Sequence, residues 1–584
     1  DDNGVQNGFD RALLNWYSID PIFYGGQRPS GIDDDDMSNL YTRRIFIDEI
    51  FPQQDIVQGQ PTGINSLDLA LYPSERGPYN MEPSASSGTL ANPLDSWAGI
   101  TRQLTSTDFE QANVEYIEFW MQDPFLDNAS NPGGKLTLNL GNISEDILKD
   151  GRKQYENGLP ENGDISTLPQ TVWGSVAPQN QALIYAFSTL GQQRANQDVG
   201  FDGYDDGEEA TAFPAFSGLE DPANDNYTYF LNTTGDVFER YKKYNGLEGN
   251  SPDTFTQTNR GSTTEPDVED INRDNTMNTI DSYFEYELDI TPTSLANINN
   301  TLIRDRKQVT VTLPNGDSEQ VRWYQFRIPL TAYTNQIGGI TDFRSIRFMR
   351  MYLSEFSENT VMRFGTLDLV RSDWRRYQQS LDDDPNNDAD GTDFSVGIIG
   401  IQENDGRYVS PPGVEREQLN NNNTLVRQNE QSLVVNTCKL EPEDSRAVYK
   451  NINVDMRQFK KLRMFIHAEE GTGAGLQDGD AVGFIRMGND FTQNYYQIEI
   501  PLAVSIPGST SESEVWKPEN EINLPIEVLA KIKALGISAG TLGNLEPTFY
   551  NVIDGVLDET GVPEFSPYTI GQQRVAIKGN PNFG

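Results

Sequence analysis

The chain has 584 residues, which is too long for a single hydrophobic core, so we expect several domains. Its formal net charge of −44 repels phosphate backbones and anionic membrane surfaces, which argues against nucleic acid as a partner. One cysteine, Cys438, and one histidine, His467, exclude an internal disulfide and a multi-histidine metal site, and they leave little material for a catalytic triad.

The two ends of the chain suggest a part of something larger. No apolar run reaches the roughly 18 residues that a transmembrane helix requires. The chain opens at Asp1 without the charged and then apolar pattern of a secretory leader. It closes with 574–581, which reads as a strand that stops short. We therefore expect an excised or matured piece of a longer protein.

Short strands are predicted along most of the chain, because apolar and charged residues alternate in many short runs. In the first 90 residues only 41–47 gives a clear strand. Two phrases then recur three times each. The first, an alternation that ends in a hydrophobic cluster, spans 114–120, 342–353 and 459–466, and the second, rich in aromatics, spans 283–288, 323–328 and 495–500. This recurrence predicts duplicated β-sandwich modules.

Polar segments between the strands suggest where the domains divide. The predicted regions are an irregular and β segment at 1–90, a sandwich region at 91–380, a linker at 381–430 and a second sandwich at 431–584. A stretch at about 156–265, dense in Asn, Asp, Gly and Pro, is too polar for a large core and should lie over the first sandwich as an insertion. The runs 91–140 and 280–375 make one interrupted sandwich or two, and we favour one.

Helices are expected to be few. Residues 144–151 begin with Ser and acids and end at Gly, and 525–536 carry apolar residues at helical spacing before a Gly. With 50 Gly, 32 Pro, 28 Phe and 25 Tyr, the composition is typical of many short strands and long loops rather than of disorder. The predicted fold class is mainly β, with tandem antiparallel β-sandwich (jelly-roll-like) domains, long loops and a few short helices.

The loop 270–281 has the oxygen spacing of a Ca²⁺-binding loop. Positions 1, 3, 5, 9 and 12 are Asp270, Asn272, Asp274, Asn278 and Asp281. Asn275 stands where such loops have a turn glycine, and Asn tolerates a left-handed backbone. An Asx-rich turn ahead of a strand accounts for the same residues equally well.

A second acidic loop spans 198–209. Positions 1, 5, 9 and 12 are Asp198, Asp202, Asp206 and Glu209, but position 3 is a glycine, Gly200, and supplies no ligand. A flexible acidic loop explains this pattern at least as simply. Both loops belong to the polar region, where Ca²⁺, the candidate cofactor, could replace a missing hydrophobic core.

The sequence offers no catalytic signature, and we predict that the protein is not an enzyme. Nucleophile-elbow, phosphate-loop and dinucleotide motifs are absent. Carboxylate pairs such as Glu115 and Glu118 are expected by coincidence among 88 acidic residues. We expect Cys438 to be a small strand residue and His467 to be a packed side chain.

Motifs from end to end of the chain resemble those of the SprA/Sov family. Two of the longer ones are NVEYIEFW at 113–120 and VEDINRDNT at 268–276. The others lie at 92–93, 97–100, 108–109, 148–158, 266–267, 347–351, 366–371, 444–450 and 575–581. The spread of these matches makes the resemblance specific.

The resemblance implies the outer-membrane translocon of the type IX secretion system, which also serves gliding motility. Members of this family are very large β-barrels that pass folded cargo. Soluble inserted domains cap the pore on the outside, and the pore opens sideways to a PorV-type protein or is closed by a plug protein. This chain lacks the many strands of such a barrel, so the resemblance implies the soluble cap region, on the extracellular side of the bacterial outer membrane. Its expected partners are the remainder of the barrel, the PorV-type protein, the plug protein and secreted cargo.

Two other functions remain open at this point. Tandem sandwiches also build carbohydrate-binding surface adhesins, which would give a positive glycan array where a translocon cap would give a blank one. A glycoside hydrolase would need a pair of carboxylates in a cleft and would turn over a substrate.

Overall fold

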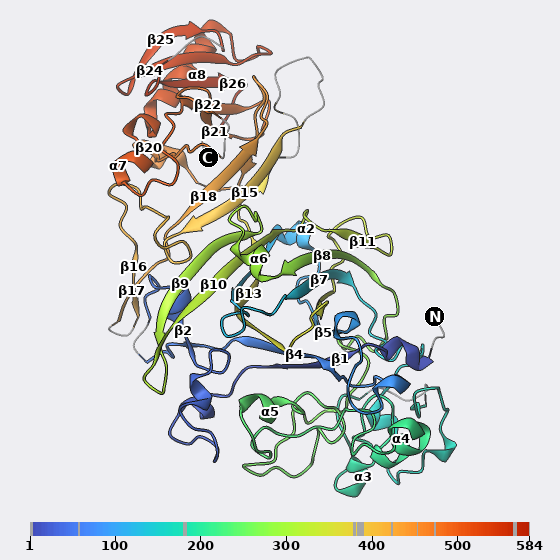
Figure 1. The fold of residues 1–584 in the computed structure, drawn as a ribbon. Coiled ribbons are helices and arrows are strands. Elements are labelled where there is room, and N and C mark those ends of the chain that lie inside the picture. The colour runs from blue at the N-terminus through green and yellow to red at the C-terminus, as the bar shows by residue number, and fades with distance from the viewer. Residues whose placement is uncertain are drawn as a thin grey trace. The chain divides into compact units, whose positions relative to one another are not determined.

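The computed structural model of the chain describes residues 4–56, 59–178, 184–377, 381, 391–421, 424–452, 454–471, 475–564 and 569–582. The chain forms two compact units (Figure 1). Unit 1 comprises Asp1–Ile50 and Pro61–Asp373, and unit 2 comprises Phe51–Gln60 and Trp374–Gly584. Antiparallel strands dominate both units, and the predicted mainly β fold class is confirmed.

Unit 1 is a sandwich of two antiparallel sheets. The six-stranded sheet has the order β1 (Ala12–Tyr17), β4 (Leu67–Arg76), β13 (Thr360–Arg371), β6 (Val114–Gln122), β10 (Ser318–Pro329) and β9 (Ile303–Thr312). The five-stranded sheet has the order β11 (Asn335–Ile337), β8 (Ser282–Ile290), β7 (Gly134–Asn142), β12 (Phe348–Ser354) and β5 (Trp97–Gln103). Strands from 97–142 and from 282–371 mix within both sheets, so these two runs build one sandwich.

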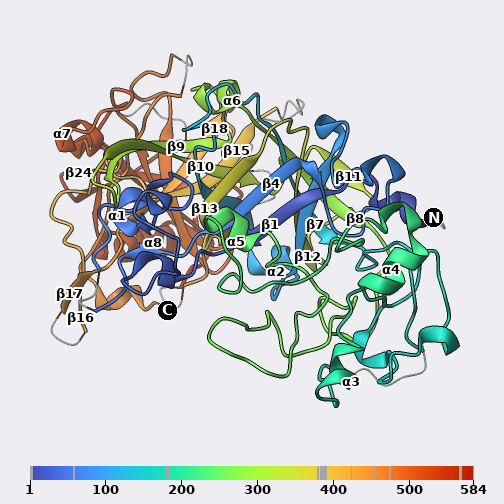
Figure 2. The ribbon, with the colours of Figure 1, turned by 60° about the horizontal axis from the view of Figure 1, so that its bottom comes forward.

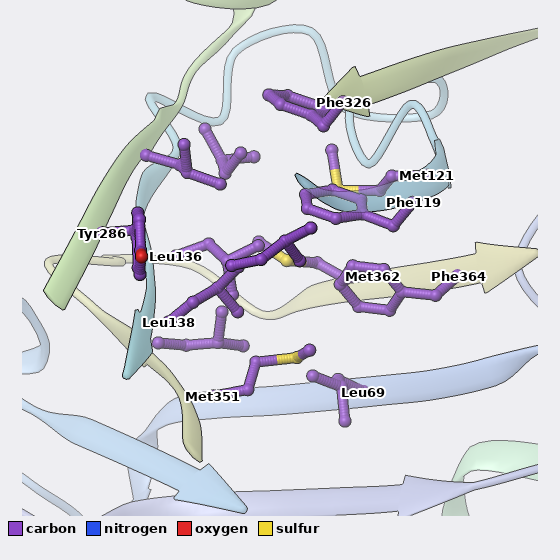
Figure 3. Packing of buried hydrophobic residues seen from close by; sticks show 14 of the residues in the cluster. Leu69, Phe119, Met121, Leu136, Leu138, Tyr286, Phe326, Met351, Met362 and Phe364 are labelled. Atoms are coloured by element: carbon purple, nitrogen blue, oxygen red, sulfur yellow. The ribbon is translucent and has the colours of Figure 1, made fainter. Parts of the chain in front are cut away.

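A shared hydrophobic core lies between the two sheets (Figure 3). Alternate residues of β7, among them Leu136 and Leu138, are fully buried in it, as the period of a strand requires. Phe119 of β6 stacks on Phe326 of β10 with ring centroids 4.9 Å apart, and it meets Phe364 of β13 edge-on. Burying each such side chain contributes about 1.5–3 kcal/mol, so this core holds the two sheets together.

The recurring phrases mark strands, but they do not occupy equivalent places. The copy at 114–120 lies in β6, and the copy at 342–353 includes most of β12, so these two belong to opposite sheets around one core. The third copy contains β20 (Lys461–Met464), which pairs with β23 (Ile522–Pro525) in unit 2. The alternation therefore reports half-buried strands, and no repeated domain follows from it.

The first 90 residues contribute directly to the sandwich, because β1 and β4 form one side of the six-stranded sheet. The strand expected over 41–47 is short: only β2 (Ile45–Phe46) pairs, with β3 (Gly63–Ile64), before helix α1 (Ile47–Ile50) begins. Two more short helices, α2 (Phe109–Ala112) and α6 (Pro292–Ala296), lie in connections of the sandwich.

The polar insertion runs from β7 to β8 and carries the short helices α3 (Gln192–Ala195), α4 (Asp206–Ala212) and α5 (Val237–Tyr241). Helix α5 and its neighbouring loop lie over β1 and β4 (Figures 1 and 2). Phe230, Val237 and Tyr241 of the insertion pack there against Tyr17 and Tyr72 of the sheet. The insertion thus shares a small core with the outer face of the sandwich.

Buried carboxylates take the place of regular structure elsewhere in the insertion. The helix predicted over 144–151 is instead an irregular loop. In it, Glu145 accepts three backbone N–H groups from the segment 271–278, and Glu269 accepts three from 147–154. Such bonds from side chain to backbone compete with a helical ladder, which explains why the helix signal fails here.

Unit 2 is built on one five-stranded sheet with the order β21 (Val482–Gly488), β22 (Tyr495–Pro501), β26 (Gln573–Lys578), β24 (Thr548–Ile553) and β25 (Val556–Val562). Helix α8 (Glu527–Ala539) covers one face and buries Leu529 and Ile532 against Ile498 and Val575. This is the helix predicted over 525–536, and Gly540 ends it in the left-handed conformation. The second layer of this unit is therefore α8 with the β20–β23 ladder rather than a second large sheet.

The remaining elements of unit 2 are short. They are helix α7 (Glu512–Val515) and the pairs β14 (Arg375–Arg376) with β19 (Val448–Tyr449), β15 (Asp393–Gly400) with β18 (Gln431–Cys438) and β16 (Gln418–Asn421) with β17 (Thr424–Arg427). Cys438 is the exposed last residue of β18. His467 is half-buried and packs edge-on against Trp516, and burial lowers its pKa.

Candidate metal centre

Helix α4 and the turn before it place two carboxylates in the interior of the insertion. The helix begins at Asp206 because Asp205 and Glu208 form a capping box, in which each side chain accepts the backbone N–H of the other residue. Glu209 follows on the inner face of the helix and has no exposed surface. Asp202, equally buried, lies in the preceding turn, which requires a glycine at Gly203 because its φ is +67°.

Asp225, from a separate segment, completes a buried triad with these two residues. One carboxylate oxygen from each of Asp202, Glu209 and Asp225 lies within 4.8 Å of the others. The three side chains belong to residues that are 0%, 0% and 1% exposed. Three carboxylates this close in the interior cannot all be charged unless something positive lies among them.

Each carboxylate of the triad has one oxygen that accepts a hydrogen bond and one that does not. The donors are the Tyr204 N–H to Asp202 Oδ1 (3.2 Å), the Ala223 N–H to Glu209 Oε2 (2.7 Å) and the Tyr79 hydroxyl to Asp225 Oδ2 (2.6 Å). No donor among the described residues reaches the other three oxygens, which are buried. The carboxyls of Asp202 and Glu209 also lie within hydrogen-bonding reach of each other. The neighbouring Glu248 also has a buried oxygen, Oε2, that no donor among the described residues reaches.

Burial raises the pKa of every carboxyl in this group. Desolvation, followed by the charges of Asp202 and Asp225, raises the pKa of Glu209 to about 11. Desolvation also raises the pKa of Asp225 to about 7, that of Glu248 to about 10 and that of Asp202 well above its ordinary value. A group of this kind holds protons at neutral pH unless a cation replaces them.

A second group of carboxylates, Asp206, Glu209 and Asp221, is equally close together, but two of its members have hydrogen-bond partners within the protein. Both oxygens of Asp206 accept from the Asn226 amide, at 3.0 and 3.2 Å. Asp221 Oδ2 pairs with Lys243 Nζ at 3.0 Å, and its Oδ1 accepts the Asp225 N–H at 3.0 Å. The protein itself satisfies the carboxylates of Asp206 and Asp221, so the triad with the unpaired buried oxygens is the candidate metal centre.

Gly200 explains how the predicted loop is completed. It is the residue at position 3, where a Ca²⁺-binding loop would supply a ligand. Its φ is +81°, and a Cβ there would overlap Asp225 Oδ2 and Tyr79 Oη. The carboxylate of Asp225, from 25 residues further along the chain, therefore lies where a side chain at position 3 would be.

Of the ligands predicted in this loop, Asp202 and Glu209 lie in the triad, Asp206 lies with Glu209 and Asp221 in the second group, and Asp198 lies in neither. Asp198 Oδ2 accepts the Ser251 N–H at 2.9 Å. Burial raises the pKa of Asp198 to about 6, and its charge acts on the buried carboxyls of Glu156 and Asp267 instead. Asp198 is thus part of a neighbouring cluster.

The other predicted loop, 270–281, uses its oxygens to hold its own turns. Asp270 pairs with Lys153 at 3.1 Å, and Asp281 pairs with Lys149 at 3.4 Å. The remaining predicted ligands bond nearby: Asn272 to Asp274, Asp274 to the Thr276 N–H, and Asn278 to Glu145. This is the arrangement of an Asx-rich turn closed by two lysines.

Asp225, Asp221 and Glu248 were not predicted from the sequence. They belong to the segment 221–248, which lies outside the twelve-residue loop and follows no ligand spacing. The acidic run DPANDN at 221–226 is the one visible signal, and in a chain with 88 acidic residues it is not specific.

The comparisons with known proteins concern the chain as a whole. Residues 209–544 match the model of a family described as motility related/secretion protein, and the match covers more than half of the chain. Glu209, Asp221 and Asp225 fall inside the matched region. None of the curated proteins matches the chain. In the described part of the chain, no helix has both the length and the apolar character needed to span a bilayer.

Proposed function

Because this chain belongs to the SprA_N family of motility-related and secretion proteins, we propose that it is the cap region of a type IX secretion translocon, which covers the exit of the outer-membrane pore. The family match over residues 209–544, which includes parts of both units, carries this proposal. The motifs at 113–120 and 575–581, outside that match, support the same family.

In this proposal the role is mechanical, and the region makes and breaks no covalent bonds. A close-packed core between two sheets resists gradual deformation, which suits a roof that directs cargo sideways. The net charge of −44 gives the surface a field that repels acidic cargo and keeps it from adhering. The proposed partners are the remainder of the barrel, a PorV-type protein, a plug protein and the secreted cargo.

The extracellular location is tested by labelling Cys438, which is exposed at the end of β18. Intact cells carrying the full-length protein are treated with a membrane-impermeant maleimide, and the protein is then isolated. We expect labelling as complete as in lysed cells, with a Cys438→Ser variant as the control for other thiols. Labelling of Cys438 only after the outer membrane is opened would contradict a cap on the outside.

The guidance of cargo is tested by photo-crosslinking in the same cells. A photoreactive amino acid is placed at exposed apolar positions, Ile298 in unit 1 and Leu545 in unit 2, which are 82% and 86% exposed. We expect at least one position to capture a secreted protein during export. If neither position captures cargo while export proceeds, the cap does not guide it.

A further inference from the structure

We propose that Asp202, Glu209 and Asp225 bind one Ca²⁺ ion, which fastens helix α4 and the turn before it to the separate segment that carries Asp225. The proposal concerns the chain itself and does not depend on its place in a translocon. It rests on the geometry of the triad: three buried carboxylates within 4.8 Å, each with an oxygen that no described donor reaches.

The described residues place too little positive charge near this triad to balance it. Lys243 is paired with Asp221, and the Arg76 guanidinium donates to the backbone carbonyls of Asn80, Asp221 and Pro222. Arg76 lies near enough to act on Glu209 and Asp225 through space, but one charge cannot offset three carboxylates and the nearby Glu248. Buried charge of this kind is stable when it coordinates a metal.

The ligand atoms select the class of metal. The triad and Glu248 offer only carboxylate oxygens, and neither the single histidine nor the single cysteine is near this part of the sequence. Oxygen-only sites favour Ca²⁺ or Mg²⁺ over Zn²⁺ and other transition metals. Ca²⁺ accepts irregular arrangements of six to eight oxygens, whereas Mg²⁺ demands a near-ideal octahedron, so ligands drawn from a turn, a helix and a separate loop favour Ca²⁺.

The ion would join elements that share no ladder. Asp202 lies in the turn before α4, and Glu209 lies on α4. Asp225 lies in a separate segment, and its backbone carbonyl accepts the N–H groups of Leu247 and Glu248 at 2.6 and 3.0 Å. The hydrophobic core beneath them is small and is centred on Tyr79, Trp173 and Phe216. A metal centre here replaces the apolar packing that the polar sequence cannot supply.

The competing explanation is that protons, and no metal, lie within the triad. A proton shared by Asp202 and Glu209 would account for their close approach, and further protonation would remove the remaining repulsion. The two explanations predict different effects of Asp225→Asn on Ca²⁺ affinity. The amide oxygen can still accept the hydrogen bond from the Tyr79 hydroxyl, but it is a poor replacement for a charged metal ligand.

The experiment is a calorimetric titration of the whole purified chain, freed of metal by a chelator, with CaCl₂ alone and with MgCl₂ alone. We expect one Ca²⁺ to bind per chain, more tightly than Mg²⁺. Asp225→Asn and Asp202→Asn should each weaken Ca²⁺ binding by at least about tenfold, because charge count sets the affinity of such sites. Asp270→Asn, a buried aspartate of the other predicted loop, is the matched control and should leave the affinity unchanged.

Thermal melting separates loss of the site from loss of the fold. In chelator, Asp225→Asn should melt at or above the wild-type midpoint, because an amide does not ionise beside Asp202 and Glu209 and needs no proton to be neutral. In Ca²⁺ the melting midpoint of the wild type should rise above that of the variant, so that the order of the two midpoints reverses. Absence of Ca²⁺ binding by the wild type, or equal Ca²⁺ affinity of Asp225→Asn and wild type, overturns the proposal in favour of shared protons.

Discussion

Single buried carboxylates decide how the insertion is held. Glu269 is 1% exposed, accepts the N–H groups of Ile147 and Gln154 at 2.7 and 3.1 Å, and thereby strengthens the link between two loops that pair at the isolated bridge of Tyr155 with Val268. Burial raises its pKa to about 8 even though these hydrogen bonds oppose the shift. The residue is useful as an acceptor, but its charge is unfavourable in that place.

A pH dependence of stability follows from Glu269. Because the pKa is higher in the folded state, its contribution is fully present at acidic pH and is lost as the pH rises through about 8. The free energy of unfolding of the wild type, relative to that of Glu269→Gln, should therefore fall between about pH 5 and pH 8, by up to about 1.4 kcal/mol per pH unit. Urea unfolding of both proteins at each pH, at constant Ca²⁺, measures this difference. Parallel curves would show that the charge of Glu269 does not matter.

At the scale of elements, the turn before α4 has a glycine where a side chain would collide with a residue far along the chain. Gly200 and Gly151 both have positive φ, +81° and +70°, and both lie in the insertion. A Cβ at Gly151 would meet open space, whereas a Cβ at Gly200 would overlap Asp225 Oδ2 and Tyr79 Oη. An alanine at either position would therefore suffer backbone strain, but only an alanine at Gly200 would also clash with neighbouring atoms.

Gly200→Ala should destabilise the protein more than Gly151→Ala. The left-handed backbone costs each alanine about 1–2 kcal/mol, and overpacking adds about 1–3 kcal/mol at Gly200 alone. Gly200→Ala should also weaken Ca²⁺ binding, because the carboxylate of Asp225 must move. Urea unfolding and calcium titration of both variants provide the measurements. An equal effect of the two substitutions would mean that the turn can relax away from Asp225.

For the whole molecule, the excess of acidic over basic residues is the dominant electrostatic feature. Acidic residues outnumber basic ones by 88 to 44, so even complete pairing would leave half of the acids without a partner. Ion pairs on the surface contribute only about 0–1 kcal/mol each, and salt weakens them. Repulsion among the surplus acids should therefore outweigh the attraction that salt screens.

Added NaCl should accordingly raise the melting midpoint, because the Debye length falls to about 10 Å at 0.1 M. CaCl₂ at matched ionic strength should raise the midpoint further in the wild type. Asp225→Asn should respond to NaCl in the same way but gain no more from CaCl₂ than from NaCl. A midpoint that falls as NaCl is added would show that the paired charges dominate.

The sequence by itself determined the elements whose signal is local. The alternation at 114–120 predicted a strand, now part of β6, and the apolar spacing at 525–536 predicted α8, because each pattern follows the period of its own element. Motifs distributed along the chain also indicated the family that the match over 209–544 confirms. The same local reasoning failed at 144–151, where Glu145 bonds to a segment more than 120 residues away.

The tertiary structure alone decided how these elements are combined. Similar strand phrases lie in opposite sheets of one sandwich, because a strand's pattern records that one face is buried and not which partner buries it. The candidate metal centre was decided in the same way. Loop spacing indicated Asp202 and Glu209, but the third carboxylate comes from Asp225, which only the packing of the insertion brings beside Gly200.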